Sequence, residues 1–154
     1  MDILILGIGN TLLSDEGVGV RLAAALAADG LPAGVRVVDG GTIGLALAPV
    51  VERAGAVLVL DAARMGRVPG TPHLVEGAAF DAFVHSRPAT PHDVGLADLV
   101  RALALAGTLP PYRALLAIEP ERLSLGDALS PAVAASLPAA TAAIRRLLTR
   151  WRGT

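Results

Sequence analysis

The sequence predicts a single α/β domain in which a mostly parallel sheet lies between two layers of helices. Three observations support this fold class. Short apolar runs of strand length recur along the chain, segments with helical spacing separate them, and the chain is 53% hydrophobic but only 3% aromatic. Strands that alternate with helices are typical of a parallel sheet covered on both faces. With 154 residues the chain suits one domain, residues 1–154.

The first half of the chain predicts a β-α-β-α-β unit. Apolar runs place strands at residues 3–6, 35–38 and 56–60, and the spacing of apolar residues places a helix at 18–28. A second helix is expected from Thr42, which can cap it, to Arg53, with a bend at Pro49.

The second half predicts two more strands and two helices. Residues 71–76 suit an edge strand, because Pro72 has no N–H for a neighbouring strand. Residues 80–91 read as a polar, proline-containing connection. A helix is expected at 94–106 and a strand at 113–118. A C-terminal helix should begin with Ser130 as N-cap and Pro131 as first residue, and Pro138 should kink or split it.

Composition excludes several classes of function. There is no cysteine, so disulfides and a thiol nucleophile are absent. The chain lacks the G-x-S-x-G and H-E-x-x-H motifs of other hydrolases. The net charge of −1 argues against a nucleic-acid partner, and no apolar run approaches the length that spans a membrane. The N-terminus runs straight into a strand, without a signal peptide, so a cytoplasmic protein is expected.

Polar residues gather where the predicted strands end, which is where open parallel sheets bind ligands. Glu16 follows the first strand in a glycine-rich loop, Asp61 ends the third strand, and His92 precedes a helix. Two carboxylates and an imidazole make a plausible oxygen and nitrogen donor set for a divalent ion such as zinc or nickel. The turn at Asp39, Gly40, Gly41 and Thr42 follows the second strand at the same edge.

The sequence resembles the hydrogenase maturation endopeptidases. The resemblance rests on G-I-G-N-T-L-L-S-D-E-G-V-G, D-G-G-T-I-G, Asp61, S-R-P-A-T-P-H-D-V-G-L and I-E-P-E-R-L-S-L-G-D-A-L-S-P-A-V, which together span nearly the whole chain. It implies a metal-dependent or aspartyl-type endopeptidase that removes the C-terminal extension of a nickel-containing hydrogenase large-subunit precursor. One departure is Glu119, where many relatives carry Gln before the proline.

The resemblance also implies roles for particular residues. Glu16, Asp61 and His92 look like the metal-binding and catalytic residues, and Asp39 to Thr42 like the loop that recognises the substrate. The ion would be nickel that the substrate supplies, although zinc or another divalent ion could occupy the same donors. The partner would be the large-subunit precursor, and a monomer is expected.

Other interpretations stay open at this stage. Gly7 and Gly9 after the first strand, with Asp39 after the second, resemble a dinucleotide-binding fingerprint, but Leu12 stands at its third glycine position. The same three ligands would also suit a non-catalytic metal carrier or sensor. Asp15 reads equally well as a cap of the following helix, and Asp15, Asp39 and Asp93 are candidate general bases.

Overall fold

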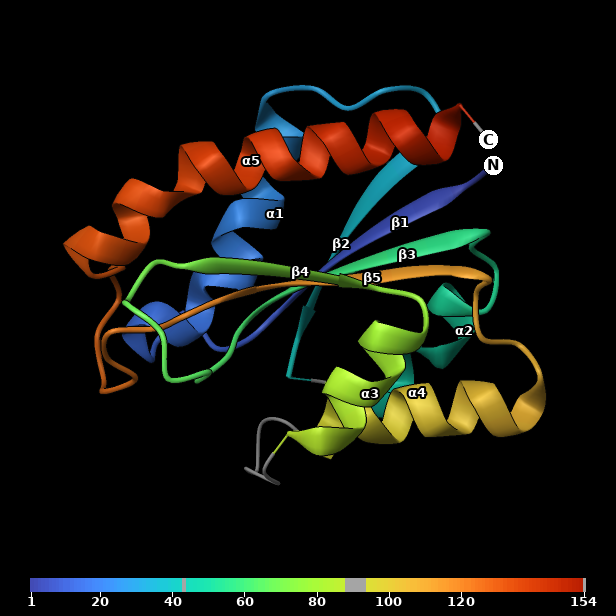
Figure 1. Cartoon of the computed structure of the whole chain (residues 1–154), viewed down its shortest axis with the longest axis horizontal. Helices are drawn as coiled ribbons and strands as arrows, with labels where there is room; N and C mark the ends of the chain where they lie inside the picture. Colours follow the sequence, from blue (N-terminus) through green and yellow to red (C-terminus); the bar gives the residue numbers. More distant parts are fainter. Residues whose placement is uncertain (43, 88–93, 154) are drawn as a thin grey trace.

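Five strands form one twisted sheet in the order β2-β1-β3-β5-β4 (Figure 1). The computed structural model describes residues 1–42, 44–87 and 94–153. Neighbouring strands are parallel except β4, which runs antiparallel to β5 at the edge. The strands are β1 (Ile3–Ile8), β2 (Val35–Gly41), β3 (Ala56–Ala62), β4 (Pro72–Glu76) and β5 (Tyr112–Ile118). The predicted fold class and the edge position of the fourth strand are confirmed.

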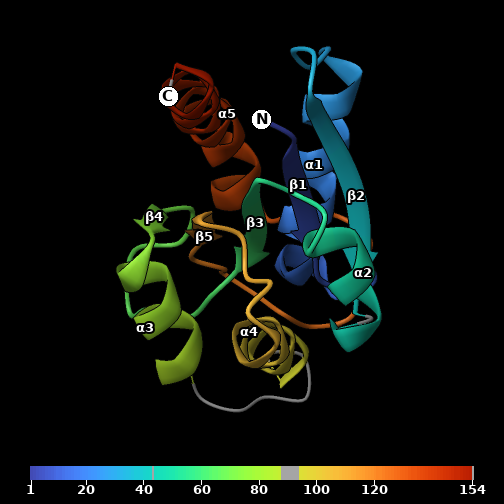
Figure 2. The ribbon, with the colours of Figure 1, turned by 90° about the vertical axis from the view of Figure 1, so that its right-hand side faces the viewer.

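Helices cover both faces of this sheet (Figure 2). On one face lie α1 (Val18–Ala28) and α5 (Pro131–Arg152); on the other lie α2 (Ala48–Val51), α3 (Ala78–Ser86) and α4 (Val94–Ala106). Two short 3-10 helices, η1 (Ser14–Gly17) and η2 (Gly44–Leu47), precede α1 and α2. None of the helices in the described part of the chain is both long and apolar enough to span a bilayer.

Alternating side chains of β1 supply two separate cores. Ile3 and Ile5 belong to the cluster under α1 and α5, whereas Leu4 and Leu6 belong to the cluster under α2, α3 and α4. Successive residues of a strand point to opposite faces, so a fully apolar strand is what a doubly covered sheet requires. The four residues are 0% exposed.

Two predictions about the helices are wrong at the level of local structure. The segment expected to be a helix from Thr42 is η2 followed by the short α2, and Pro49 lies in the first turn of α2 instead of bending a longer helix. Pro is favoured in a first turn because the N–H it lacks would have no helical partner there. The expected connection at 80–91 instead begins inside α3, which buries Phe80 and Val84 against the sheet.

Pro138 does not split α5. The helix is one element from Pro131 to Arg152, with Ser130 as its predicted N-cap. Pro138 lies on the exposed side. The carbonyl of Ala134, which loses its helical partner because proline has no N–H, can therefore turn toward water.

The connections that matter for function leave the carboxyl ends of the parallel strands. Within the sheet, Gly7 of β1 pairs with Asp39 of β2 on one side and with Leu60 of β3 on the other. Asp39 and Asp61 therefore lie near the carboxyl ends of their strands at nearly the same level, with the glycine-rich loop between them. Because adjacent strands lie about 4.8 Å apart, these two acids are separated by roughly 10 Å along the sheet.

Candidate functional site

The glycine-rich loop after β1 folds tightly onto its surroundings. Gly9 has a φ of +125°, and a Cβ there would lie 2.0 Å from the carbonyl oxygen of Glu16. A Cβ on Gly19 would lie 2.0 Å from the carbonyl oxygen of Leu60. Neither position tolerates a side chain without movement of the backbone. These glycines bring η1 and the start of α1 against the end of β3.

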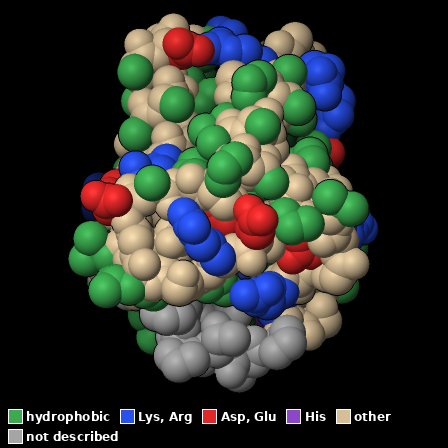
Figure 3. Space-filling model, turned by 90° about the vertical axis from the view of Figure 1, so that its left-hand side faces the viewer, with side chains coloured by type: hydrophobic (Ala, Val, Ile, Leu, Met, Phe, Trp, Pro, Cys, Tyr) green, Lys and Arg blue, Asp and Glu red, His purple; other side chains and the backbone are tan. Residues whose placement is uncertain are grey.

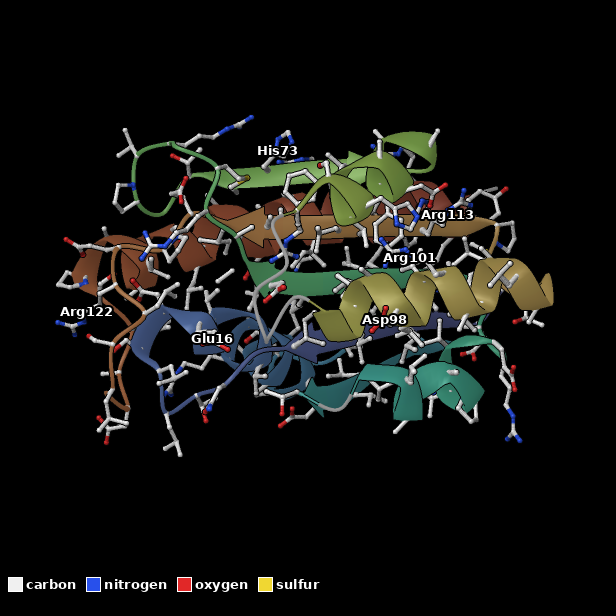
Figure 4. All side chains as sticks on the ribbon, turned by 90° about the horizontal axis from the view of Figure 1, so that it is seen from below. Glu16, His73, Asp98, Arg101, Arg113 and Arg122 are labelled. Atoms are coloured by element: carbon white, nitrogen blue, oxygen red, sulfur yellow. The ribbon has the colours of Figure 1, made fainter. Side chains whose placement is uncertain are left out.

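Glu16 and Asp61 lie at this carboxyl edge, as the sequence predicts. Glu16 is in η1 and 8% exposed, and Asp61 is near the end of β3 and 7% exposed. Figure 4 shows Glu16 at the opposite end of the sheet from Arg113, which lies near the start of β5. Two acids this deeply buried at a ligand-binding edge are a functional-site candidate.

Asp61 uses both of its carboxylate oxygens. Its Oδ1 accepts a hydrogen bond from the backbone N–H of Ala62 at 2.8 Å. Its Oδ2 lies 3.1 Å from Nη1 of Arg87, whose Nη2 donates to the carbonyl of Ala62 at 3.1 Å. Arg87 follows α3 directly, so this ion pair joins the C-terminal end of α3 to the end of β3.

His92, the third predicted ligand, lies outside the described residues, and so does Asp93. In the ranges that the structure describes, no three His, Asp or Glu side chains are grouped so that they could hold a metal ion. The three-ligand site therefore stays a prediction.

Asp15 is a structural anchor and not a helix cap. Neither η1 nor α1 has a side-chain cap, which corrects the expectation from the sequence. Asp15 is 0% exposed; its Oδ1 accepts from Ser130 N at 2.7 Å, and its Oδ2 accepts from Ser130 Oγ at 2.8 Å. Oδ2 also accepts from the N–H groups of Glu121 and Arg122 at 2.9 and 3.1 Å. Asp15 thus fastens the Glu16 loop to the segment between β5 and α5.

The pKa of Asp15 follows from these contacts. Burial by itself would raise the pKa of this carboxyl, but the hydrogen bonds from Ser130, Arg122 and Glu121 outweigh it and hold the pKa below the usual 3.8. Asp15 therefore stays ionised at neutral pH with its oxygens engaged. That state does not suit a general base, for which Asp15 was one of the candidates.

Glu119 organises a third loop at the same edge. It directly follows β5, is 4% exposed, and its Oε1 accepts the N–H groups of Met65 and Arg67 at 2.8 and 2.7 Å. It shapes the connection between β3 and β4. The sequence marks it only as a departure from relatives; its place directly after a strand is the signal that could have identified it.

The turn after β2 borders an open hollow. Gly41 has a φ of +50°, and its N–H donates to Oδ1 of Asp39 at 2.9 Å. The N–H of Gly9 donates to the carbonyl of Gly41 at 2.9 Å, which joins this turn to the Glu16 loop. The hollow has a volume of about 240 Å³ and is lined by Gly9, Asn10, Thr11, Val20, Asp39, Gly41 and Thr42. Gly40 faces the core, where a Cβ would press on apolar side chains.

The surface at the carboxyl edge combines charged and apolar side chains. Figure 3 shows acidic and basic groups together in the middle of this face, with apolar groups around them. Leu12 of the Glu16 loop and Leu45 of η2 are more than half exposed, at 61% and 53%. A polypeptide bound here would meet both kinds of surface.

Comparison with known proteins gives a consistent result. A sequence model of the family described as hydrogenase maturation protease matches residues 20–147. The hydrogenase expression/formation protein HupD of Rhodobacter capsulatus is 39% identical over 97% of this chain and 72% of its own length. The hydrogenase 2 maturation protease of Escherichia coli is 35% identical over 89% of this chain and 84% of its own.

Solved structures agree with this comparison. The hydrogenase maturating endopeptidase HybD from E. coli superposes with a TM-score of 0.90 at 33% identity, over 97% of this chain and 93% of that one. The [NiFe] hydrogenase maturation protease HybD from Thermococcus kodakarensis gives a TM-score of 0.80 at 25% identity, over 96% and 99% of the two chains.

Proposed function

This chain belongs to the hydrogenase maturation protease family, and we propose that it removes the C-terminal extension of a nickel-containing hydrogenase large-subunit precursor after nickel insertion. As a member of this family it is an endopeptidase. Membership of the family gives the reaction class. The proposal concerns the nickel-loaded state of the precursor and the residues that recognise it.

The observation that carries the proposal is the pair of buried carboxylates, Glu16 and Asp61, at the ligand-binding edge of the sheet. Carboxylate oxygens suit a divalent cation, and His92 would add a nitrogen ligand. Held by these donors, a divalent cation would polarise the scissile carbonyl and activate water. The chain has no cysteine to act instead as a nucleophile.

Nickel in this scheme is part of the substrate. Glu16, Asp61 and His92 would provide ligands to an ion that the precursor carries, so that only a loaded precursor is held in position for cleavage. Zinc or another divalent ion could bind the same donors in the isolated peptidase. A monomer in the cytoplasm is part of the same proposal.

The alternative of a dinucleotide-binding protein has little support. In that fold the pyrophosphate lies at the N-terminus of the first helix. Here η1 occupies the approach to α1, with Asp15 and Glu16 buried in it. Two acids at this position would repel a pyrophosphate.

The direct test is incubation of the peptidase with candidate large-subunit precursors, followed by measurement of their intact mass. The proposal predicts loss of a single C-terminal segment from a cognate precursor. Binding of free metal without cleavage of any nickel-loaded precursor would instead favour a metal carrier.

The turn after β2 is proposed to recognise the precursor, which gives a prediction for Asp39→Ala and Gly41→Ala. Each variant should lower the cleavage rate by roughly ten-fold or more, because both residues line the hollow and Asp39 holds the turn through Gly41 N–H. Cleavage of a cognate precursor is measured, and thermal melting reports the fold.

Gly107→Ala is the matched control for Gly41→Ala. Gly107 also has a positive φ, +71°, and lies beyond α4, away from the hollow. Both alanines should strain the backbone by about 1 kcal/mol, so both should melt at lower temperature. Only Gly41→Ala should slow cleavage. If the two turn variants cleave like wild type, the turn has no part in recognition.

A further inference from the structure

Arg87 places a guanidinium directly on one of the two proposed ligand carboxylates. Its Nη1 lies 3.1 Å from Oδ2 of Asp61, and the two side chains are only 9% and 10% exposed. A second hydrogen bond, from Nη2 to the carbonyl of Ala62, fixes the orientation of the guanidinium. The contact is therefore a buried and well-oriented ion pair.

The buried carboxylate of Asp61 is compensated by a positive charge in addition to a hydrogen bond. Taking an ion out of water is costly unless an opposite charge or hydrogen bonds replace the lost solvation. Among the contacts of Asp61 in the described part of the chain, Ala62 N–H donates a hydrogen bond and Arg87 supplies a positive charge. A divalent cation on Asp61 would supply the same compensation and would compete for the same oxygen.

We propose that Arg87 is a built-in counter-cation for Asp61, which holds this carboxylate in position until a divalent cation binds there and displaces the guanidinium. The inference rests on the proposed function, because it takes Asp61 as a ligand for the ion of the substrate. Arg87 acts through Asp61 and is a positioning residue. By reciprocal linkage, the ion weakens the Arg87–Asp61 pair as much as the pair weakens binding of the ion.

Phe83 offers the displaced guanidinium another contact. Cζ of Arg87 already lies 5.9 Å from the centroid of the Phe83 ring, one helical turn earlier in the chain. A cation is attracted to the face of an aromatic ring at such a distance. Arg87 also lies just beyond α3 in extended backbone, so its side chain can move without disturbing the helix. The contact with Phe83 does not depend on the pair with Asp61.

The test compares nickel binding by the untagged peptidase and its variants in titration calorimetry. Arg87→Gln keeps a hydrogen-bond donor but removes the charge, and Arg87→Lys keeps the charge. Binding of Ni²⁺ should be tighter by roughly ten-fold or more in Arg87→Gln, equivalent to about 1.4 kcal/mol, and within about three-fold of wild type in Arg87→Lys. Asp61→Asn should weaken it.

Arg113→Gln is the matched control. Arg113 forms a partly buried pair with Asp81, with its Nε 2.7 Å from Oδ1, near the start of β5 and away from Asp61. Loss of that pair should lower the melting temperature without changing nickel affinity. Nickel should also raise the melting temperature of Arg87→Gln more than that of wild type or Arg113→Gln. If Arg87→Gln folds only when nickel is added, the proposal is equally supported.

Equal or weaker nickel binding by Arg87→Gln than by wild type overturns the counter-cation role. So does an Arg87→Gln variant that nickel does not restore to the folded state. Failure of the proposed function has a different signature, because it appears as absent cleavage of every precursor by wild type. Normal wild-type cleavage, together with unchanged nickel affinity in Arg87→Gln, rejects the role of Arg87 alone.

Discussion

Glu16→Gln should reduce cleavage of a cognate precursor by about 100-fold or more while the protein stays folded. The amide has the shape of the carboxylate but no charge, so it is a much poorer ligand for a divalent cation. A 100-fold loss corresponds to about 2.7 kcal/mol, which is within the range of one ligand bond. Cleavage is followed by intact mass, and thermal melting should show only a small change.

Glu121→Gln is the control for this experiment. Glu121 is exposed and lies in the neighbouring segment between β5 and α5, where only its backbone N–H contacts Asp15. Its side-chain charge should be irrelevant to cleavage. A Glu16→Gln variant that cleaves as fast as Glu121→Gln would remove Glu16 from the proposed site.

Asp15→Asn should lower the free energy of unfolding by about 3 kcal/mol. The carboxylate accepts one hydrogen bond at Oδ1 and three at Oδ2, from three backbone N–H groups and the hydroxyl of Ser130. An amide must direct its NH₂ group at one of these sets. Its least costly orientation faces the NH₂ toward the N–H of Ser130, which leaves that donor without an acceptor in a buried place. Chemical denaturation measures the difference.

The pH dependence of this difference has a definite sign. Because the folded pKa of Asp15 is below its usual value of 3.8, its ionisation stabilises the fold fully above pH 3.8. This contribution is lost as the pH falls through the folded pKa. The gap between wild type and Asp15→Asn should therefore narrow below pH 3.8. A gap that stays constant down to acid unfolding would contradict the role assigned to the charge.

Asp29→Asn supplies the matched control. Asp29 is exposed and pairs with Arg145 at the surface, at 3.3 Å. Exposed ion pairs contribute little, so this variant should remain within about 0.5 kcal/mol of wild type. A loss as large as that of Asp15→Asn would mean that neither burial nor hydrogen bonding explains the effect.

The central strands could be predicted from sequence because β1, β3 and most of β5 are short apolar runs between polar or glycine-containing turns. A strand that is buried on both faces must be apolar at successive positions, so a continuous apolar run in the sequence predicts it. The α3 helix was missed because its nine residues bury only Phe80 and Val84, too few to give a periodic pattern. Pro138 predicts an interruption that α5 does not have. The packing of α5 on the sheet stabilises the helix, although the local preference of proline would interrupt it.

The site was predictable only in part. The positions of Glu16 and Asp61 follow from the rule that ligands bind where parallel strands end. The partners of buried acids do not follow from any local pattern. Asp15 meets Ser130 across 115 residues and Asp61 meets Arg87 across 26, and only the fold brings these groups together. For the same reason the sequence alone makes a cap role for Asp15 as plausible as a functional one, because a cap depends only on nearby residues.

The measurement that tests the central claim most directly compares nickel-loaded and nickel-free forms of one cognate precursor. Both are incubated with the same untagged peptidase, and cleavage is followed by intact mass. If the ion of the substrate completes the site at Glu16 and Asp61, the loaded form should be cleaved about 100-fold faster or more, equivalent to about 2.7 kcal/mol. Cleavage of the nickel-free precursor at the same rate would contradict the account.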